Sequence, residues 1–185
     1  MKATHNMNKK TIRANMLSKR STLLNNVQNS ASKAICTQVL SLTAYQHAQK
    51  IALYQAINGE IDLFFLFEHA LNTGKHCYMP RVLNDGTNTL LFLPTTKNTP
   101  QKPNQWGILE PVVPASNCIS LESIDLMLLP LVAFNAQGIR LGQGAGFYDR
   151  TLQTKRPKCL LGVGYEFQKH EALTPEPWDI PLHGI

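Results

Sequence analysis

Stretches in which apolar residues recur at helical spacing alternate along this chain with short, continuous apolar runs. The helical spacing extends over residues 9–26, 30–42 and 62–72, and one more helix is expected at 146–154. The continuous runs occupy residues 50–57, 76–83, 89–93, 124–134 and 158–165. Runs of this length predict buried strands, and Ser30 is the expected N-cap of the second helix.

The alternation of strands and helices predicts the fold class. It favours an α/β fold in which a mainly parallel sheet is covered by helices on both faces. The chain has 185 residues, 43% of them hydrophobic and 16% charged, which is typical of one globular domain. We therefore expect a single three-layer, Rossmann-like domain over residues 1–185. The irregular, proline-containing stretch at 94–114 is expected to carry a binding loop.

The composition also limits the cellular setting. No run approaches the roughly 18 apolar residues of a membrane-spanning helix, and the polar, basic N-terminus lacks the apolar core of a signal peptide. The four cysteines form no Cys-x-x-Cys pair, so no structural zinc site is predicted. We expect a cytoplasmic protein without a membrane partner, and a monomer as the simplest assembly.

The positive charge is concentrated near the N-terminus. The net charge is +6, and the eight charged residues that precede Glu60 are all basic. Lys9 and Arg13 are four residues apart, so on a helix both project from the same side. Such a side can bind nucleic acid, close over a polyphosphate or simply be solvated. The charge pattern alone leaves these alternatives open.

A glycine-rich segment follows the most apolar of the predicted strands. Gly142, Gly144 and Gly146 alternate there, and successive backbone N–H groups in such a loop can form a concavity that binds anions. The segment matches neither the Walker A pattern nor the dinucleotide-binding fingerprint, and an ordinary tight turn is the alternative. In a parallel sheet, ligands bind beyond the carboxyl ends of the strands, where this loop is expected.

Two aspartates are candidate metal ligands. Asp149 follows the glycine-rich segment directly and Asp179 lies near the C-terminus. Mg²⁺ commonly takes only one or two protein carboxylates and completes its shell with water and phosphate oxygens. Isolated aspartates also serve as helix caps or surface groups, so the residue types alone do not decide. No Gly-x-Ser-x-Gly motif is present, which argues against acyl-enzyme chemistry.

The segment at 129–150, Leu-Pro-Leu-Val-Ala-Phe-Asn-Ala-Gln-Gly-Ile-Arg-Leu-Gly-Gln-Gly-Ala-Gly-Phe-Tyr-Asp-Arg, closely resembles the signature of the 5-formyltetrahydrofolate cyclo-ligases, also called methenyltetrahydrofolate synthetases. Shorter elements that resemble this family follow one another in the expected order. They are Lys-Lys-Thr-Ile-Arg at 9–13, Ser-Lys-Arg at 18–20, Asn-Gly-Glu-Ile-Asp at 58–62, Tyr-Met-Pro-Arg at 78–81, Trp-Gly-Ile-Leu-Glu-Pro at 106–111 and Trp-Asp-Ile-Pro-Leu at 178–182. The resemblance extends almost from end to end.

The resemblance implies an ATP-dependent ring closure that requires Mg²⁺. Its substrate is 5-formyltetrahydrofolate, with or without a polyglutamate tail, and its products are 5,10-methenyltetrahydrofolate, ADP and phosphate. The formyl oxygen attacks the γ-phosphate to give an N5 iminium phosphate, N10 adds to the activated carbon, and phosphate leaves. Alignment and charge stabilisation are expected to supply most of the catalysis.

The resemblance also implies a role for particular residues. Arg140 and Tyr148 are the expected catalytic residues, and Asp149 and Asp179 the expected Mg²⁺ ligands. The expected ATP-binding residues are Lys9, Lys10, Arg13, Arg140, Leu141, Gly142, Gln143, Gly144, Ala145, Gly146, Phe147 and Tyr148. The expected folate-binding residues are Gln55, Glu60, Trp106, Gln143, Gly144, Ala145, Gly146 and Phe147.

The chain departs from the family pattern at three positions. Gln143 and Ala145 stand where many members carry a basic residue or small residues, so weaker phosphate binding is expected unless Lys9, Lys10 or Arg13 compensates. Asn135 replaces the more usual aspartate, and both residue types accept turn conformations.

Two other functions remain as alternatives. One is a non-catalytic nucleotide- or RNA-binding module on the same scaffold, and the other is a small-molecule kinase with a related phosphate loop. The sequence contains no RNA-recognition motif and no basic stretch interleaved with aromatic residues, so no nucleic-acid partner is expected.

Overall fold

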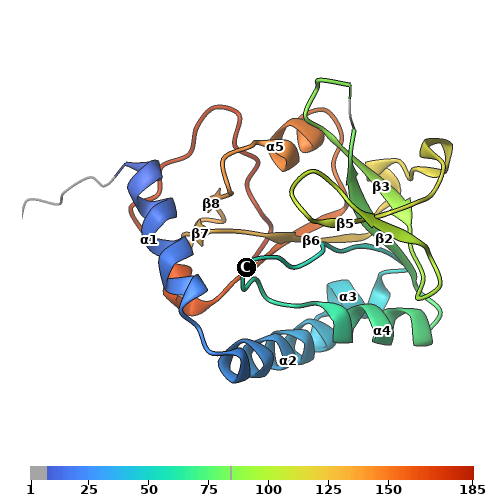
Figure 1. Cartoon of the computed structure of the whole chain (residues 1–185), viewed down its shortest axis with the longest axis horizontal. Coiled ribbons are helices and arrows are strands. Elements are labelled where there is room, and N and C mark those ends of the chain that lie inside the picture. The colour runs from blue at the N-terminus through green and yellow to red at the C-terminus, as the bar shows by residue number, and fades with distance from the viewer. Residues whose placement is uncertain (1–7, 84) are drawn as a thin grey trace, which may run out of the picture.

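A five-stranded sheet forms the centre of the computed structural model, which describes residues 8–83 and 85–185. The strands are β1 (Lys50–Ala52), β2 (His76–Val82), β3 (Leu90–Pro94), β6 (Leu126–Pro130) and β9 (Cys159–Val163), in the order β3-β2-β1-β6-β9. Four of them are parallel, and β3 pairs antiparallel with β2 at the edge (Figure 1). The predicted mainly parallel sheet is confirmed.

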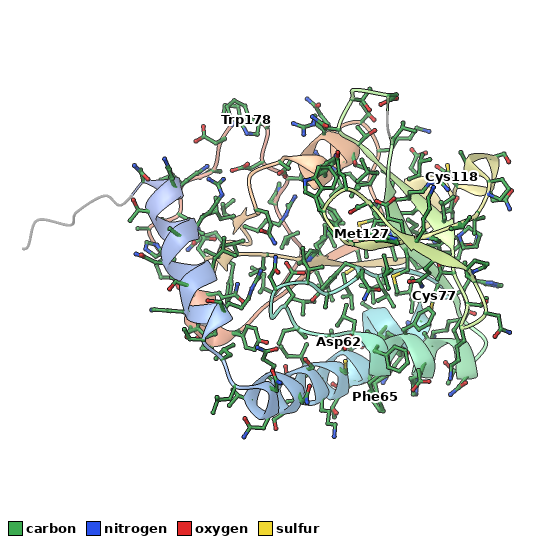
Figure 2. All side chains as sticks on the ribbon, viewed as in Figure 1. Asp62, Phe65, Cys77, Cys118, Met127 and Trp178 are labelled. Carbon is green, nitrogen blue, oxygen red and sulfur yellow. The ribbon has the colours of Figure 1, made fainter. Side chains whose placement is uncertain are left out.

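The continuous apolar runs arise because both faces of the sheet are covered. In β6, Leu126 and Leu128 contribute to the core on one face, whereas Met127 and Leu129 contribute to the core on the other. All four side chains are fully buried, and Met127 lies in the middle of the molecule in Figure 2. Strand side chains alternate between faces, so a strand between two cores must be apolar at every position.

Helices cover the two faces unequally, as Figure 1 shows. One face carries α2 (Asn25–Ser41), α3 (Thr43–His47) and α4 (Phe64–Asn72). The opposite face carries the six-residue α5 (Phe147–Leu152), and η1 (Ala115–Asn117) and η2 (Leu121–Ser123) are short 3-10 helices. Ile180 and Leu182 of the C-terminal segment complete the core on the α5 face. The predicted three-layer arrangement is confirmed. No helix in the described ranges has the length and apolar character needed to cross a membrane.

The first helix, α1 (Lys9–Ser21), packs beyond the sheet, against a two-stranded hairpin. That hairpin consists of β7 (Ala133–Phe134) and β8 (Arg140–Leu141). Ile12 and Met16 of α1 are buried in the same cluster as residues of this hairpin and its approach. A second hairpin, β4 (Gln101–Pro103) and β5 (Leu109–Pro111), lies within the stretch expected to form a binding loop, and η3 is a short 3-10 helix at Glu166–Gln168.

Several element boundaries differ from the prediction. The helix expected to begin at Ser30 begins at Asn25, so Ser30 is an interior residue rather than the N-cap, and the first helix ends at Ser21 rather than near residue 26. The apolar runs at 50–57 and 124–134 extend past β1 and β6 because the residues that leave the sheet after each strand stay buried or half-buried, and the second run reaches β7 of the hairpin. Apolar runs report burial, and burial does not end where strand pairing ends.

The turn at Gly138 connects β7 to β8 and joins them to the C-terminal segment. Its φ is +79°, and a Cβ at this position would lie 2.6 Å from the backbone oxygen of Leu182. The N–H of Leu182 donates to the carbonyl of Gly138 at 3.0 Å. The close contact therefore holds the C-terminal segment against the hairpin that carries Arg140.

Substitution of this glycine tests the contact. Gly138→Ala is expected to lower the free energy of unfolding by about 3 kcal/mol, because a positive φ and a backbone clash add together. Gly74→Ala is the matched control, since Gly74 has φ +76° and a methyl group added there would meet nothing within 4 Å. It should cost only about 1 kcal/mol. Urea unfolding monitored by circular dichroism gives both values, and equal losses would contradict the proposed contact.

Candidate functional site

The candidate site lies at the carboxyl ends of β1 and β6. The chain crosses from β1 to β2 on one side and from β6 to β9 on the other, so these two strands form the point at which the strand order reverses. Open α/β sheets bind ligands at such a point. A cavity of about 810 Å³ opens there, lined by α1, the loop after β1, the β4–β5 hairpin, the glycine-rich loop and the C-terminal segment.

The glycine-rich loop connects β8 to α5, and its residues from Gly142 to Gly146 all line the cavity. Gly144 has φ +109° and Gly146 has φ +70°, which are backbone conformations that favour glycine. A Cβ on Gly146 would lie 2.8 Å from the guanidinium of Arg150. Two of the three alternating glycines are therefore required by the backbone itself, while Gly142 has open space around it.

The basic N-terminal helix meets this loop. Arg13 Nε donates to the carbonyl of Gly142 at 2.9 Å, and its guanidinium lies beside Gly144. Lys9, one turn earlier, also lines the cavity. Lys10 is exposed and lies outside the set of residues that line it. The structure thus brings together Lys9, Arg13 and the loop, and does not bring Lys10 to them.

Lys9 also contacts the C-terminal segment. Its Nζ lies 3.1 Å from a carboxylate oxygen of Glu176 and 3.4 Å from one of Asp179. Asp179 accepts a hydrogen bond from the backbone N–H of Glu176 at 2.8 Å, which holds the two acidic residues in one turn. Trp178 lies between them in the chain, is 60% exposed and lines the cavity; Figure 2 shows it at the same end of the molecule as the first turn of α1.

Arg140 and Asp149 form a partly buried ion pair on the cavity wall. The Arg140 side chain is buried, and it donates to Asp149 Oδ1 and to the backbone oxygen of Ile180, both at 2.6 Å. Because Ile180 follows Asp179 directly, Arg140 also holds the chain next to the second candidate metal ligand. These contacts leave the guanidinium little freedom, so its charge is held at one place.

The acidic residues at this rim fit one kind of metal site. The described residues contain no group of three or more His, Cys, Asp or Glu side chains arranged to hold a metal ion. A Zn²⁺ site of the structural type would need such a group. Asp149 and Asp179 both line the cavity, which also offers cationic groups for phosphate. This donor set fits Mg²⁺ held by one or two carboxylates together with phosphate oxygens and water.

Glu60 is a buried carboxylate that lies after β1 and contacts the glycine-rich loop. Its Oε2 accepts the N–H of Ile57 at 3.2 Å, and its Oε1 accepts Nε2 of Gln143 at 3.2 Å. Arg20 Nη2 lies 3.4 Å from the same Oε1. Burial raises the pKa of Glu60, and the positive charge of Arg20 is the largest influence that opposes this rise. Gln143 therefore connects the glycine-rich loop to Glu60.

Aromatic side chains form much of the remaining wall. Trp106 is 51% exposed and packs edge-on against Phe147, with ring centroids 5.5 Å apart. Burial raises the pKa of Tyr148, so its hydroxyl stays protonated and can donate a hydrogen bond at neutral pH. Gln55 and Leu141 line the same cavity. With Trp178, both tryptophans of the chain contribute to it.

Two further residues take part in the site although the sequence analysis gave them no role. Glu110 is buried in the cavity wall and accepts hydrogen bonds from the N–H of Val82 at 3.0 Å and from Nδ2 of Asn104 at 2.7 Å. Arg20 is fully buried behind Glu60. The position of Arg20 was detectable, because it follows Ile12 and Met16 at intervals of four residues and shares one side of α1 with them.

Asn135 explains one departure from the family pattern. Its side chain is buried; Oδ1 accepts the N–H groups of Gln137 and Ile139, both at 3.0 Å, and Nδ2 donates to the backbone oxygen of Leu173 at 3.0 Å. The two accepted bonds are those that an aspartate would also accept in this turn. The third needs the amide, so asparagine ties the turn to the segment near Leu173.

Comparisons with known proteins agree with this architecture. The model of the 5-formyltetrahydrofolate cyclo-ligase family matches residues 5–185. The 5-formyltetrahydrofolate cyclo-ligase of Haemophilus influenzae is 39% identical over 160 residues, which cover 85% of this chain and 86% of that protein. The protein of the same name from Escherichia coli is 33% identical over 160 residues, covering 85% and 88%.

Solved structures are similar as well. The 5,10-methenyltetrahydrofolate synthetase of Aquifex aeolicus matches with a TM-score of 0.81 at 34% identity, covering 95% of this chain and 87% of that one. The synthetase of Mycoplasma pneumoniae matches with a TM-score of 0.76 at 29% identity, covering 96% and 97%. These similarities confirm the resemblance that the sequence motifs indicated, and the chain belongs to the 5-formyltetrahydrofolate cyclo-ligase family.

Proposed function

We propose that the protein converts 5-formyltetrahydrofolate to 5,10-methenyltetrahydrofolate with ATP and Mg²⁺, releasing ADP and phosphate. The relatives named above carry the names of this activity. The observation that best supports it is the meeting of a cationic wall and a buried carboxylate in one cavity. Arg13 contacts the glycine-rich loop at Gly142, and the next residue of that loop, Gln143, contacts Glu60.

The ATP phosphates are proposed to bind to the cationic wall. Lys9 supplies a point charge, Arg13 a planar donor group, and the loop from Gly142 to Gly146 its backbone N–H groups. Arg13 and Arg150 both contact carbonyls of this loop. They supply positive charge near Gln143 and Ala145, where the sequence itself has none.

Asp149, with Asp179 as a second or indirect ligand, is the proposed holder of Mg²⁺. When bound, the metal ion neutralises part of the phosphate charge and orients the phosphate for attack. Arg140 pairs with Asp149 at 2.6 Å, so the carboxylate is held in a single orientation. Asp179 is held in the same way by Lys9 and by the N–H of Glu176.

The folate is proposed to bind with its pterin at Glu60. The pterin presents neighbouring N–H groups, and an ionised carboxylate accepts two such donors at once. Trp106, Phe147 and Gln55 are the proposed walls for the rest of the molecule. The two aromatic side chains among them supply contact area with little loss of conformational entropy.

In the proposed reaction the formyl oxygen attacks the γ-phosphorus of ATP, and the bond to ADP breaks. The amide-like formyl oxygen is a poor leaving group, and its phosphorylation turns it into a good one. N10 then forms a bond to the formyl carbon and loses its proton to the phosphate group or to water, and the C–O bond breaks with loss of phosphate. Arg140 stabilises the charge on the transferred group, and the protonated Tyr148 donates a hydrogen bond to an oxygen of that group.

An assay with 5-formyltetrahydrofolate, ATP and Mg²⁺ tests the function by the absorbance of methenyltetrahydrofolate. Arg140→Ala and Asp149→Ala are each expected to lower kcat/KM about 100-fold or more, because both remove charge from the transfer step. Glu122→Ala is the control, since Glu122 is exposed, pairs with the exposed Lys155 and lies outside the cavity lining. A folded wild-type protein that makes no ATP-dependent product would refute the function, and a stable phosphorylated product would indicate a kinase.

Substitution of the two neighbouring lysines of α1 tests the cationic wall proposed to bind the ATP phosphates. Lys9→Met should weaken ATP binding about tenfold, because a charged hydrogen bond is lost, whereas Lys10→Met should leave the Kd nearly unchanged. Isothermal titration calorimetry measures both values, and melting curves show that both variants fold. If the two variants weaken ATP binding equally, the total charge of the helix determines the ATP affinity, and the position of Lys9 in the cavity does not.

The pH dependence of folate binding tests Glu60. Burial raises the pKa of this carboxyl, so it takes up a proton at a higher pH than an ordinary glutamate does. The protonated group no longer accepts two hydrogen bonds, and folate affinity should fall as the pH is lowered from about 8 to about 5. Quenching of tryptophan fluorescence gives the Kd at each pH. Glu60→Gln should bind folate more weakly, and its folate affinity should not depend on pH in this range. If the variant keeps the pH dependence, a group other than Glu60 causes it.

The alternative function, a non-catalytic RNA-binding module, predicts a different ligand for the same protein. It expects RNA binding that weakens with salt and that ATP fails to compete. A gel-shift titration with and without ATP separates the two functions. The cytoplasmic location and the monomeric state stay predictions from the sequence.

A further inference from the structure

Arg20 is a charged side chain in a place where charge is unfavourable. It lies in the last turn of α1 and is 1% exposed, although its neighbour Lys19 is exposed. A buried guanidinium must be paired and hydrogen-bonded to be tolerated. The contacts of its three nitrogen atoms therefore indicate what the residue does.

Two of these nitrogens hold the loops at the strand ends. Nε donates to the carbonyl of Asn58 at 2.9 Å, in the loop after β1. Nη1 donates to the carbonyl of Leu131 at 3.3 Å, in the segment after β6. Arg20 thus joins the two loops that border the reversal point of the sheet. The turn that leads to Glu60 is held from the other side as well, because the hydroxyl of Tyr165 donates to the carbonyl of Gly59 at 2.9 Å.

The third nitrogen is directed at Glu60. Nη2 lies 3.4 Å from Oε1 of Glu60, and it makes no hydrogen bond with any of the described residues. Its contact with Glu60 is therefore an ion pair in a buried setting, where charges interact more strongly than in water. Arg20 itself is not among the residues that line the large cavity, so it does not contact a ligand bound there directly, and Glu60 is the cavity side chain with which it pairs.

The other groups that face Glu60 are neutral. Tyr54 lies in the loop after β1, Tyr148 on α5 and Tyr165 after β9, and the pKa of each is raised by burial, so all three keep their protons at neutral pH. Gln143 and the N–H of Ile57 contribute dipoles only. Arg20 is the cation that offsets the burial of the carboxylate. Without it the carboxyl would be protonated over a wider pH range and would present a donor where the pterin presents donors.

We propose that Arg20 is a positioning residue that keeps Glu60 as an ionised, correctly oriented acceptor for the folate, an inference that rests on the proposed function. Arg20 is not a catalytic residue, because it does not line the cavity proposed to hold the substrate and the nucleotide. Its location on α1 gives the helix two tasks. The first turns place Lys9 and Arg13 at the cationic wall proposed for the ATP phosphates. The last turn places Arg20 beside Glu60, the carboxylate proposed to bind the folate.

A double-mutant cycle on the full chain tests the inference. The variants are Arg20→Met, Glu60→Gln and the two combined, with Lys19→Met as the control on the exposed side of the same helix turn. Folate and ATP dissociation constants are measured by tryptophan fluorescence across the pH range, and kcat and KM by the ring-closure assay. Arg20→Lys is included as the conservative variant that keeps the charge and loses the planar fork.

Arg20→Met is expected to raise the Kd and KM for folate about tenfold at neutral pH. It should leave the Kd for ATP and the kcat at saturating folate within about twofold, and shift the acid limb of folate binding to higher pH. Arg20→Lys should restore the position of the acid limb. The combined variant should bind folate as Glu60→Gln alone does if Arg20 acts on the folate through Glu60 and not through its hydrogen bonds to Asn58 and Leu131. Lys19→Met should match the wild type.

Arg20→Met leaves Glu60 buried without a cation. If this variant is too unstable to purify, the combined variant decides the question, since it removes both charges together and replaces a buried ion pair by neutral groups. Folate affinity equal to that of Glu60→Gln supports the inference; a further loss, or an equal loss of ATP affinity, assigns Arg20 a general structural role and overturns it. Wild-type protein without ATP-dependent product would instead refute the proposed function.

Discussion

The apolar contact between α1 and the β7–β8 hairpin determines the geometry of the whole site. Ile12 and Met16 are buried against Val132, Ala133 and Leu141, so the helix has one orientation on the hairpin. This contact determines which residues of the helix face the cavity, which are buried and which are exposed to solvent. The cationic wall, the buried Arg20 and the exposed lysines all follow from which side of α1 is apolar.

Pairing of opposite charges is the second constraint on the site. Lys9 pairs with Glu176 and Asp179, Arg140 with Asp149, and Arg20 with Glu60. Each pair joins segments that are far apart in the chain or lie on either side of the glycine-rich loop. A cavity that must hold a polyphosphate and a metal ion needs both signs of charge, and pairing allows these groups to be partly buried without large unbalanced fields.

The sequence allowed much of this to be predicted, and the errors have common physical causes. The strands were located because a sheet covered on both faces needs apolar residues at every position. Their ends were overestimated at 50–57 and 124–134, since the residues beyond β1 and β6 remain buried or half-buried after strand pairing ends. Ser30 was expected as an N-cap, but α2 begins at Asn25, where Leu24 precedes it without a side-chain cap. Residues 25–30 continue the helix although most of their side chains are exposed, so neither a side-chain cap nor burial marks its start.

The sequence by itself determined the family and the chemical groups of the site, because the glycine-rich segment and the shorter motifs keep their residue types and their order. Only the tertiary structure decided which of those groups meet. Lys9 lines the cavity while Lys10 is exposed, and Arg20, without an assigned role in the sequence, lies behind Glu60. The physical reason is that helical spacing predicts which side chains of α1 lie on the same side of the helix. The segment against which that side packs is more than a hundred residues away in the chain, so only the tertiary structure shows it.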